Sequence, residues 1–359
     1  MKFIKKILCL LIIIGQLVVL AGCPNNYTDE VKRQSVFKFG FFDTVSYVYS
    51  YANDKEEVFN NNANKVFEIL EEYHKLFDIY NIHYDQEDKM INNLYTVNKN
   101  AGKEPVVVDQ KLIDFLLYTK EIYEITNGET NVMFGSVLNI WHKAREKASL
   151  LEIYEVPKLE DLEKANAYTS IELLKIDDEK NTVFIADANA RIDVGAIGKG
   201  YATEKAGQYL ESIGCKAYVL NIGGNLRVIG EKLDGSGWPT GVTNPRRLTI
   251  DDPTYAIRIN IKDTSCVTSG DYERYYFCDG KRYHHIIDKD TLMPSEYFSS
   301  ITILVKDSGL ADALSTALFS MSYEDGKALV DTLEEDVEVI WIDLEGNVTY
   351  TDGIVPIES

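Results

Sequence analysis

Residues 191–229 decide the fold, and they read R-I-D-V-G-A-I-G-K-G-Y-A-T-E-K-A-G-Q-Y-L-E-S-I-G-C-K-A-Y-V-L-N-I-G-G-N-L-R-V-I. The first four residues, 191–194, predict a short strand, and the glycines after them predict a loop. Residues 201–213 then predict a helix that stops at Gly214. A second apolar run over 217–222 predicts another strand, and a further strand follows G-G-N. Strand and helix therefore alternate in the middle of the chain.

The remaining chain predicts an α+β fold, in which a mixed sheet is flanked by helices, either as one unit or as two lobes around a site. Helices are expected over 56–80, 111–126, 160–166, 309–321 and 323–333. Strands are expected over 38–51, 255–261, 265–269, 273–278, 299–306, 337–342 and 347–350, with a hairpin around Asp177-Asp178.

The chain begins with the pattern of an exported lipoprotein. A basic start, M-K-F-I-K-K, precedes an apolar run that ends L-A-G-C at Cys23, which is the layout of a secretory leader. The last four residues resemble a bacterial lipobox, where cleavage leaves a lipid-bearing cysteine. We expect a leader at 1–22, a polar tether over 23–36 from lipidated Cys23, and a domain over 37–359 on the extracytoplasmic face of the cell membrane. The alternative is an uncleaved anchor helix.

The charge of the chain excludes one class of partner. The formal net charge is −20, and loss of the three leader lysines takes the mature chain to −23. Such a surface repels the phosphates of nucleic acids and anionic lipid head groups. We therefore expect no nucleic-acid binding, and any anionic ligand must be held locally by backbone amides, a helix N-terminus, a lysine or a metal ion.

Three cysteines, Cys215, Cys266 and Cys278, remain in the expected domain. Their irregular spacing matches no zinc motif and no disulfide-dense scaffold. Buried free thiols are the preferred interpretation, and pairing of Cys266 with Cys278 across neighbouring strands is the alternative.

The stretch D-V-G-A-I-G-K-G-Y-A, residues 193–202, crowds three glycines around Lys199. A Walker A loop requires G-x-x-x-x-G-K-[ST], and a dinucleotide fingerprint requires G-x-G-x-x-G. Here Gly200 follows the lysine, and the glycine spacing is the reverse of the fingerprint. The stretch is either a tight turn into a helix or part of another kind of phosphate site.

Asp312 and Thr316 lie four positions apart on a predicted helix, so a carboxylate and a hydroxyl share one face. Hard oxygen ligands of this kind suit Mg²⁺ or Ca²⁺. The alternative is that Asp312 only complements the dipole of its own helix.

His284 and His285 are adjacent, so only one of them can face a site from a strand. A neutral imidazole in that place could take a proton from an attacking hydroxyl. Two polar turns precede them, N-I-G-G-N over 221–225 and S-G-D-Y-E over 269–273.

These five stretches resemble, in their order along the chain, the ApbE family of flavin transferases, the FAD:protein FMN transferases. The resemblance rests on D-V-G-A-I-G-K-G-Y-A, N-I-G-G-N, S-G-D-Y-E, H-H-I-I-D and A-D-A-L-S-T-A. It extends from F-F-D-T near Phe41 through F-G-S-V-L-N-I-W over 134–141 to the last strand. Many members have A-M-G-T where this chain has F-F-D-T, Asp where it has Asn131, and Pro where it has Lys289.

The resemblance implies a reaction and a set of site residues. Members bind FAD and Mg²⁺ and move the FMN half of FAD onto a Ser or Thr hydroxyl of another protein, as a phosphoester, with release of AMP. It implies Asp312, Thr316 and the backbone carbonyl of Ala196 as Mg²⁺ ligands and His285 as the base. The residues implied in contact with FAD are Phe42, Tyr80, Thr130, Asn131, Phe134, Gly135, Asp193, Lys199, Ile286 and Ser315.

Two other functions would use the same pocket. One is an Mg²⁺-dependent FAD pyrophosphatase that gives FMN and AMP, and the other is a lipoprotein that binds FAD without catalysis. Acceptors of the family are similar in carrying an S-G-A-T-like stretch, which this chain lacks. The resemblance therefore implies an acceptor in trans, an exported or membrane-bound protein.

Overall fold

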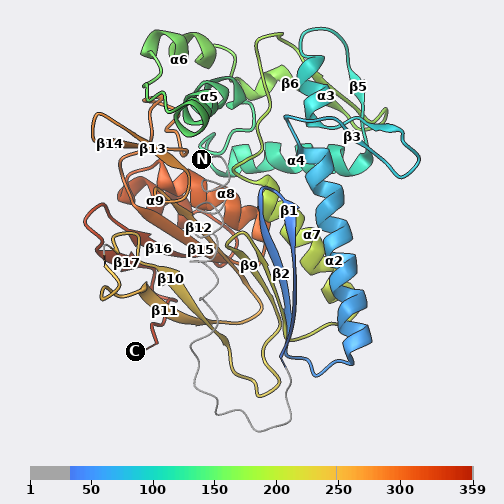
Figure 1. Ribbon diagram of the computed structural model, residues 1–359, viewed down its shortest axis with the longest axis vertical. Coiled ribbons are helices and arrows are strands. Elements are labelled where there is room, and N and C mark those ends of the chain that lie inside the picture. Colours follow the sequence, from blue (N-terminus) through green and yellow to red (C-terminus); the bar gives the residue numbers. More distant parts are fainter. Residues whose placement is uncertain (1–32, 248, 358–359) are drawn as a thin grey trace.

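The computed structural model describes residues 33–247 and 249–357, which contain an eight-stranded sheet (Figure 1). Its strands, in spatial order, are β1 (Gln34–Phe41), β2 (Thr44–Ser50), β8 (Tyr218–Ile222), β9 (Asn225–Ile229), β12 (Ser265–Gly270), β15 (Ser300–Val305), β16 (Glu338–Ile342) and β17 (Val348–Tyr350). Every pairing between neighbouring named strands of the described residues is antiparallel. The α+β class expected from the sequence is confirmed.

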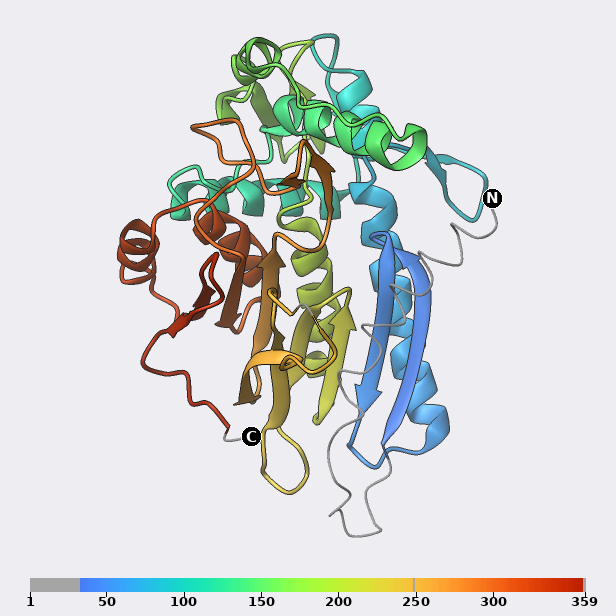
Figure 2. The same ribbon diagram turned by 60° about the vertical axis from the view of Figure 1, so that its left-hand side comes forward.

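Three long helices cover one face of this sheet (Figure 2). They are α2 (Glu56–Phe77), α7 (Gly198–Ser212) and α8 (Ser308–Phe319). In α2 the buried side chains recur every three or four residues from Phe59 to Phe77, as an amphipathic helix requires. Helix α8 is buried along its length except at Thr316, because it lies between the sheet and the other helices, and Asp307 caps its first turn by accepting from Leu310 N at 2.9 Å.

The remaining helices and the short sheets lie around the large sheet and its three helices (Figure 1). The other helices of the described chain are α3 (Leu94–Lys99), α4 (Gln110–Ile125), α5 (Gly135–Leu151), α6 (Leu159–Asn166) and α9 (Tyr323–Val330). The short sheets pair β3 (His83–Tyr84) with β4 (Met90–Ile91), β5 (Val106–Val107) and β6 (Leu174–Asp177) with β7 (Thr182–Ile185), β10 (Trp238–Thr243) with β11 (Tyr255–Ile261), and β13 (Tyr275–Cys278) with β14 (Lys281–His284).

The prediction of one strand over residues 38–51 was wrong. The segment is a hairpin, β1 and β2, joined by Phe42 and Asp43 with φ of 51° and 55°. Two successive positive φ angles define the tight turn that suits hairpin twist. Neither residue is Gly or Asn, so the usual sequence signal of such a turn is missing. The strand also begins at Gln34, before the predicted domain boundary at residue 37.

The predicted strand at 191–194 was also wrong, because only Arg191 forms an isolated bridge, with Phe134. The helix expected to start at Tyr201 starts three residues earlier, so Gly198, Lys199 and Gly200 form the first turn of α7. Helix α5 was not expected, because its charged residues obscure the apolar face that includes Trp141.

Two expectations remain, one for the state of the cysteines and one for the start of the chain. Cys215, Cys266 and Cys278 are free, which excludes the alternative of a Cys266–Cys278 disulfide in this structure. The leader and Cys23 lie outside the described residues. Among the helices of residues 33–247 and 249–357, none has the length and apolar character needed to cross a membrane.

A buried ion pair fixes α7 to the sheet. Arg227 of β9 is fully buried, and its guanidinium donates to Glu204 at 2.9 Å and to Glu211 at 2.8 Å, both on α7. Glu204 also accepts from Ser308 N at 3.0 Å and thereby joins α7 to the start of α8. Position 207 is glycine because a Cβ there would lie 2.9 Å from Arg227 Cγ.

We predict that Arg227→Met lowers the free energy of unfolding by about 3–5 kcal/mol, because Glu204 would stay buried without its partner. Denaturant titration followed by circular dichroism measures this loss. The control is Lys164→Met, which breaks an exposed pair with Glu160 and should cost less than about 1 kcal/mol. Equal losses in the two variants would contradict this role of Arg227.

Candidate functional site

The site is built where α7 and α8 cross. Gly200 N, in the first turn of α7, donates to Asp312 Oδ2 on α8 at 2.8 Å. A Cβ at position 200 would lie 2.3 Å from the backbone oxygen of Ser308 and 2.4 Å from Asp312 Cβ. Only glycine permits this approach, so it is this glycine that lets the carboxylate reach the N-terminus of α7.

Asp312 is a costly buried carboxylate. It lies in the second turn of α8, and Asp307 already caps that helix, so interaction with its own helix dipole does not account for it. Burial raises the pKa of the Asp312 carboxyl, and the charge of Lys199 opposes this shift. Burial likewise lowers the pKa of the Lys199 ammonium, and Asp312 opposes that shift. The Asp312 carboxylate and the Lys199 ammonium are thus both removed from water, and they lie near each other.

Lys199 faces the turn that follows β8. Its ammonium donates to Asn225 Oδ1 and lies 3.5 Å from the oxygen of Gly223. The D-V-G-A-I-G-K-G-Y-A and N-I-G-G-N stretches therefore meet beside Asp312. Gly223 in turn packs against Thr44, since a Cβ there would lie 2.3 Å from Thr44 Oγ1, and this contact brings the F-F-D-T stretch close to the same turn.

Few protein oxygens lie near Asp312, so they fit a hard cation that keeps some of its water ligands. Thr316 is one turn further along α8, partly exposed, with its hydroxyl 3.5 Å from the backbone oxygen of Asp312. Ala196 is partly exposed just before α7. Within the described residues there is no cluster of three or more His, Cys, Asp or Glu side chains that could hold a metal. Such a sparse set suits Mg²⁺, which usually binds one or two carboxylates together with water and substrate phosphates.

His285 lies just past the end of β14, and its Nδ1 is buried with no hydrogen-bond partner in the described structure. Burial, followed by the charges of Arg274 and Arg145, holds the pKa of His285 well below its usual value of 6.5. Lys199 acts in the same direction. The imidazole is therefore neutral at neutral pH and faces a group of cations.

His284 has a different environment. Its Nε2 is 2.9 Å from the backbone oxygen of Ser295, its Nδ1 accepts from Ile286 N at 3.3 Å, and its ring packs edge-on against Phe319. The two histidines thus have distinct environments: His284 is hydrogen-bonded at the strand end, and His285 lies near the cations.

Tyr80 lies beside Arg191 and Asp193, near the turn that leads into α7. Its half-exposed ring stacks on His142 of α5 at 4.9 Å, and Arg191 lies 5.9 Å from the ring centroid. Partial burial and the nearby Asp193 carboxylate raise the pKa of Tyr80 to about 12. Asp193 accepts from Gly195 N at 2.9 Å and so shapes the turn that leads into α7.

Residues 130–135 lie beside this turn. Asp193 N donates to Val132 O at 2.8 Å, and a Cβ on Gly135 would lie 2.4 Å from Arg191 O. Phe134 is buried and bridges Arg191. The Asn131 amide donates to Thr169 O at 2.8 Å.

Three further predicted FAD-contact side chains, like that of Phe134, are buried. The buried Thr130 hydroxyl donates to Ala313 O on α8 at 2.8 Å. Ser315 is fully buried, 2.8 Å from Ser269 Oγ and 2.8 Å from Asp312 O. Ile286 belongs to the main core. The hydrogen bonds of Thr130 and Ser315 therefore hold α8 in place close to Asp312.

The last turn of α2 fixes two of the predicted pocket residues. Phe42 N donates to His74 Nδ1 at 3.3 Å, and the two rings meet edge to face at 5.6 Å. Asp78 accepts from Tyr80 N at 2.7 Å and from His83 Nε2 at 2.8 Å. Phe42 and Tyr80 are thus held by neighbouring turns of one helix.

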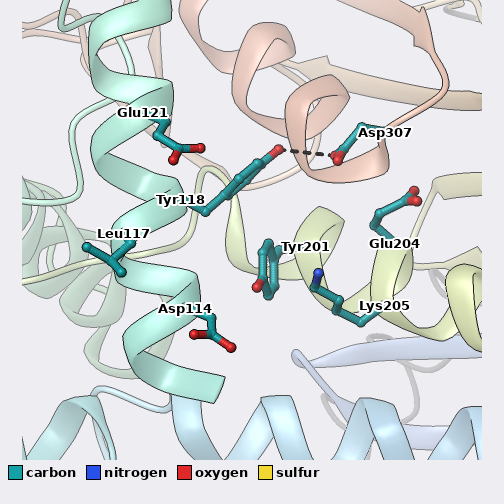
Figure 3. A pocket seen from close by; sticks show the side chains of 8 residues that line it. All are labelled: Asp114, Leu117, Tyr118, Glu121, Tyr201, Glu204, Lys205 and Asp307. Atoms are coloured by element: carbon teal, nitrogen blue, oxygen red, sulfur yellow. Dashed lines mark hydrogen bonds between the residues drawn. The ribbon is translucent and has the colours of Figure 1, made fainter. Parts of the chain in front are cut away.

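Two larger hollows lie away from these residues. One, of about 470 Å³, borders the end of α8 and residues 288–291. The other, of about 350 Å³, lies between α4 and α7 (Figure 3). In it Tyr118 donates to Asp307 at 3.1 Å, while Glu204 is engaged with Arg227. Neither hollow includes Asp312, Lys199 or His285. The candidate site is therefore defined by these polar groups and their neighbours, and not by a cavity.

Sequence reasoning missed two arginines, Arg145 and Arg274. Burial lowers the pKa of Arg145, followed by the charge of Arg274, so the two cations lie near each other and near His285. Arg274 directly follows S-G-D-Y-E and could have been found from that position. Arg145 could not, because it lies on α5, which was not predicted.

The chain was compared with known proteins. A family model described as the ApbE family matches residues 42–341. An FAD:protein FMN transferase of Vibrio cholerae serotype O1 is 28% identical over 331 residues, with 92% of each chain covered. One from Treponema pallidum (strain Nichols) is 30% identical over 274 residues, which cover 73% of this chain and 74% of the relative.

Solved structures give the same family. The ApbE protein of Thermotoga maritima superposes with a TM-score of 0.75 at 27% identity, covering 89% of this chain and 97% of that chain. The flavin transferase ApbE from Vibrio cholerae gives 0.70 at 25% identity, with 89% and 98% covered.

We predict that Gly200→Ala lowers the free energy of unfolding by about 1–3 kcal/mol, because its Cβ would force α7 and α8 apart. Gly195→Ala is the control, since its Cβ would meet only Asp193 Oδ1 at 3.2 Å, and it should change stability by no more than about 0.5 kcal/mol. Urea unfolding of both variants measures the difference. An unchanged midpoint for Gly200→Ala would show that the crossing is not tight.

Proposed function

This chain belongs to the ApbE family and is an FAD:protein FMN transferase, and we propose that it transfers the FMN moiety of FAD to a Ser or Thr hydroxyl of an acceptor protein, with Mg²⁺ bound and AMP released. One observation carries this proposal. A buried carboxylate, Asp312, a desolvated Lys199 and a neutral His285 with an unpartnered Nδ1 converge within the same group of cations.

In the proposed reaction the acceptor oxygen attacks the FMN-side phosphorus of FAD. The bond from that phosphorus to the bridging oxygen breaks, and AMP leaves with the bridging oxygen. The hydroxyl proton goes to Nδ1 of His285, which is neutral and free to accept it. Phosphoryl transfer depends chiefly on positioning and on neutralising the phosphate oxygens, for which Lys199, Arg274 and Arg145 supply positive charge.

We propose that Asp312, Thr316 and the carbonyl of Ala196 hold the Mg²⁺. When bound, such an ion polarises the phosphoryl group and stabilises the leaving phosphate. Its charge and that of Lys199 would offset the repulsion between an anionic substrate and a chain of net charge −20.

We propose that Phe42, Tyr80, Asn131, Phe134, Gly135 and Asp193 line the FAD pocket. The support is their placement on neighbouring segments, held by the last turn of α2 and by the contacts of residues 130–135 with Arg191 and Asp193. Thr130, Ile286 and Ser315 would shape the pocket from behind.

We further propose that the mature chain is anchored through lipidated Cys23 on the extracytoplasmic face of the cell membrane. The L-A-G-C sequence after an apolar leader supports this. The acceptor would then be an exported or membrane-bound protein.

The test of function mixes the protein, FAD, Mg²⁺ and a reporter protein that carries an exposed Ser-Gly-Ala-Thr stretch. We expect in-gel flavin fluorescence of the reporter, a mass gain of one FMN, and equimolar AMP. Asp312→Ala should abolish labelling in Mg²⁺. Free FMN and AMP without a labelled reporter would identify a pyrophosphatase, and bound FAD without either product would identify a storage protein. Normal labelling by Asp312→Ala would exclude the metal site proposed here.

His285→Ala should retain FAD binding and lose about 10²–10⁴-fold in transfer rate, the usual contribution of a general base. Because His285 must be neutral and its pKa lies well below 6.5, kcat/KM of the unmodified enzyme should fall on the acid side only below pH 6.5. Steady-state transfer rates from pH 4.5 to 8 measure this limb. An acid limb above pH 6.5, or the same limb in His285→Ala, would assign the base to another group.

A further inference from the structure

The outer face of the β1–β2 hairpin carries an aromatic strip, which consists of Phe37, Phe39, Tyr47 and Tyr49. Phe37 contacts Phe39 edge to face at 5.4 Å and Tyr47 at 5.6 Å, and Tyr47 stacks on Tyr49 at 5.6 Å. The rings therefore form one continuous surface across both strands. Its exposure rises toward β1, from 8% for Tyr49 to 52% for Phe37 and 62% for Phe39.

Within the described chain this strip is left uncovered at its β1 end. On the opposite face of the hairpin Lys38 lies 4.9 Å from the ring of Phe67 on α2, so that side is occupied. On the strip's own face Tyr49 belongs to the core cluster that contains Trp238, Tyr47 packs against this cluster, and the ring of Tyr51 meets Trp238 at 5.0 Å. Phe37 and Phe39 are not part of it. Among the described strands, β1 is the edge of the sheet and pairs only with β2. Within this part of the chain the rings of Phe37 and Phe39 are thus exposed.

The sequence places these rings close to the proposed lipid anchor. Nine residues, 24–32, separate Cys23 from Arg33, so an extended chain spans at most about 35 Å between the two. The first described element after this short tether is β1 itself, with the strip beginning at Phe37. A tether of this length keeps the start of β1 within about 35 Å of the proposed anchor.

We propose that the aromatic strip docks on the lipid bilayer beside the Cys23 anchor, an inference that rests on the proposed lipidation. Aromatic rings are favoured at the boundary between head groups and acyl chains, and a lipid anchor is reinforced by a second apolar contact. Arg33, 4.9 Å from the ring of Tyr49, places positive charge beside the strip, while the net charge of the whole chain is −20. The strip is therefore suited to face the bilayer.

The test uses the full lipidated chain in phosphatidylcholine vesicles and compares F39W with F277W. Phe277 on β13 is 50% exposed and serves as a matched control, and the native Trp141, Trp238 and Trp341 are buried and give a constant background. We expect the emission of F39W to shift to the blue when vesicles are added, and to be quenched in vesicles with brominated acyl chains relative to unbrominated ones. The emission of F277W should not change. F37W repeats the measurement if F39W fails to fold, as judged by circular dichroism.

Each other outcome overturns the docking. Unquenched F39W means that the strip does not reach the acyl chains, and equal quenching of both variants means that the protein lies on the bilayer without a preferred face. A blue shift of F39W before vesicles are added means that the tether or a second copy covers the strip. Failure of the chain to float with the vesicles instead shows that the proposed lipid anchor is absent, which is a separate result.

Discussion

The close approach of α7 to α8 at Gly200 is the constraint on which the site depends. A single hydrogen bond from Gly200 N to Asp312 at 2.8 Å marks the contact. Arg227 holds α7 against the sheet through Glu204, and Glu204 accepts from the first residue of α8. Helix α8 is held from its other side by the hydroxyl of Thr130. The carboxylate is therefore positioned by backbone and by buried polar groups.

The charges around Asp312 explain how a strongly acidic protein can hold an anion. Lys199, Arg145 and Arg274 gather near His285, and burial, with a smaller effect of the neighbouring positive charges, lowers the pKa values of Lys199, Arg145 and His285. Such a group is unfavourable in the free protein, because like charges are brought together and Nδ1 of His285 has no partner. A dianionic pyrophosphate would offset the repulsion between these cations, so the unfavourable arrangement of the free site would favour binding of the anion.

The sequence predicted the elements whose patterns are strong. The α2 and α4 helices follow from apolar spacing, and Asn127-Gly128 ends α4 with φ of 50° and 81°. The turn at Phe42-Asp43 was missed because tertiary contacts, such as that of Phe42 N with His74, hold a conformation these residues do not favour alone. Glycine spacing could not show that Gly200 serves helix packing, since its neighbour, Ser308, is distant in the chain. For the same reason Arg145 and Arg274 could not be assigned to one cluster.

The pairing of β2 with β8 has a consequence for the order of folding. Ser50 and Tyr218 are register partners separated by 168 positions in the chain. Closing this pair must overcome the entropy of a long loop, and such long-range pairing is slow. The two-residue turn at Phe42-Asp43 lets β1 and β2 pair with each other first. Until β8 docks, β2 is an unpaired edge, so the N-terminal side of the sheet is open to pairing with another chain during folding.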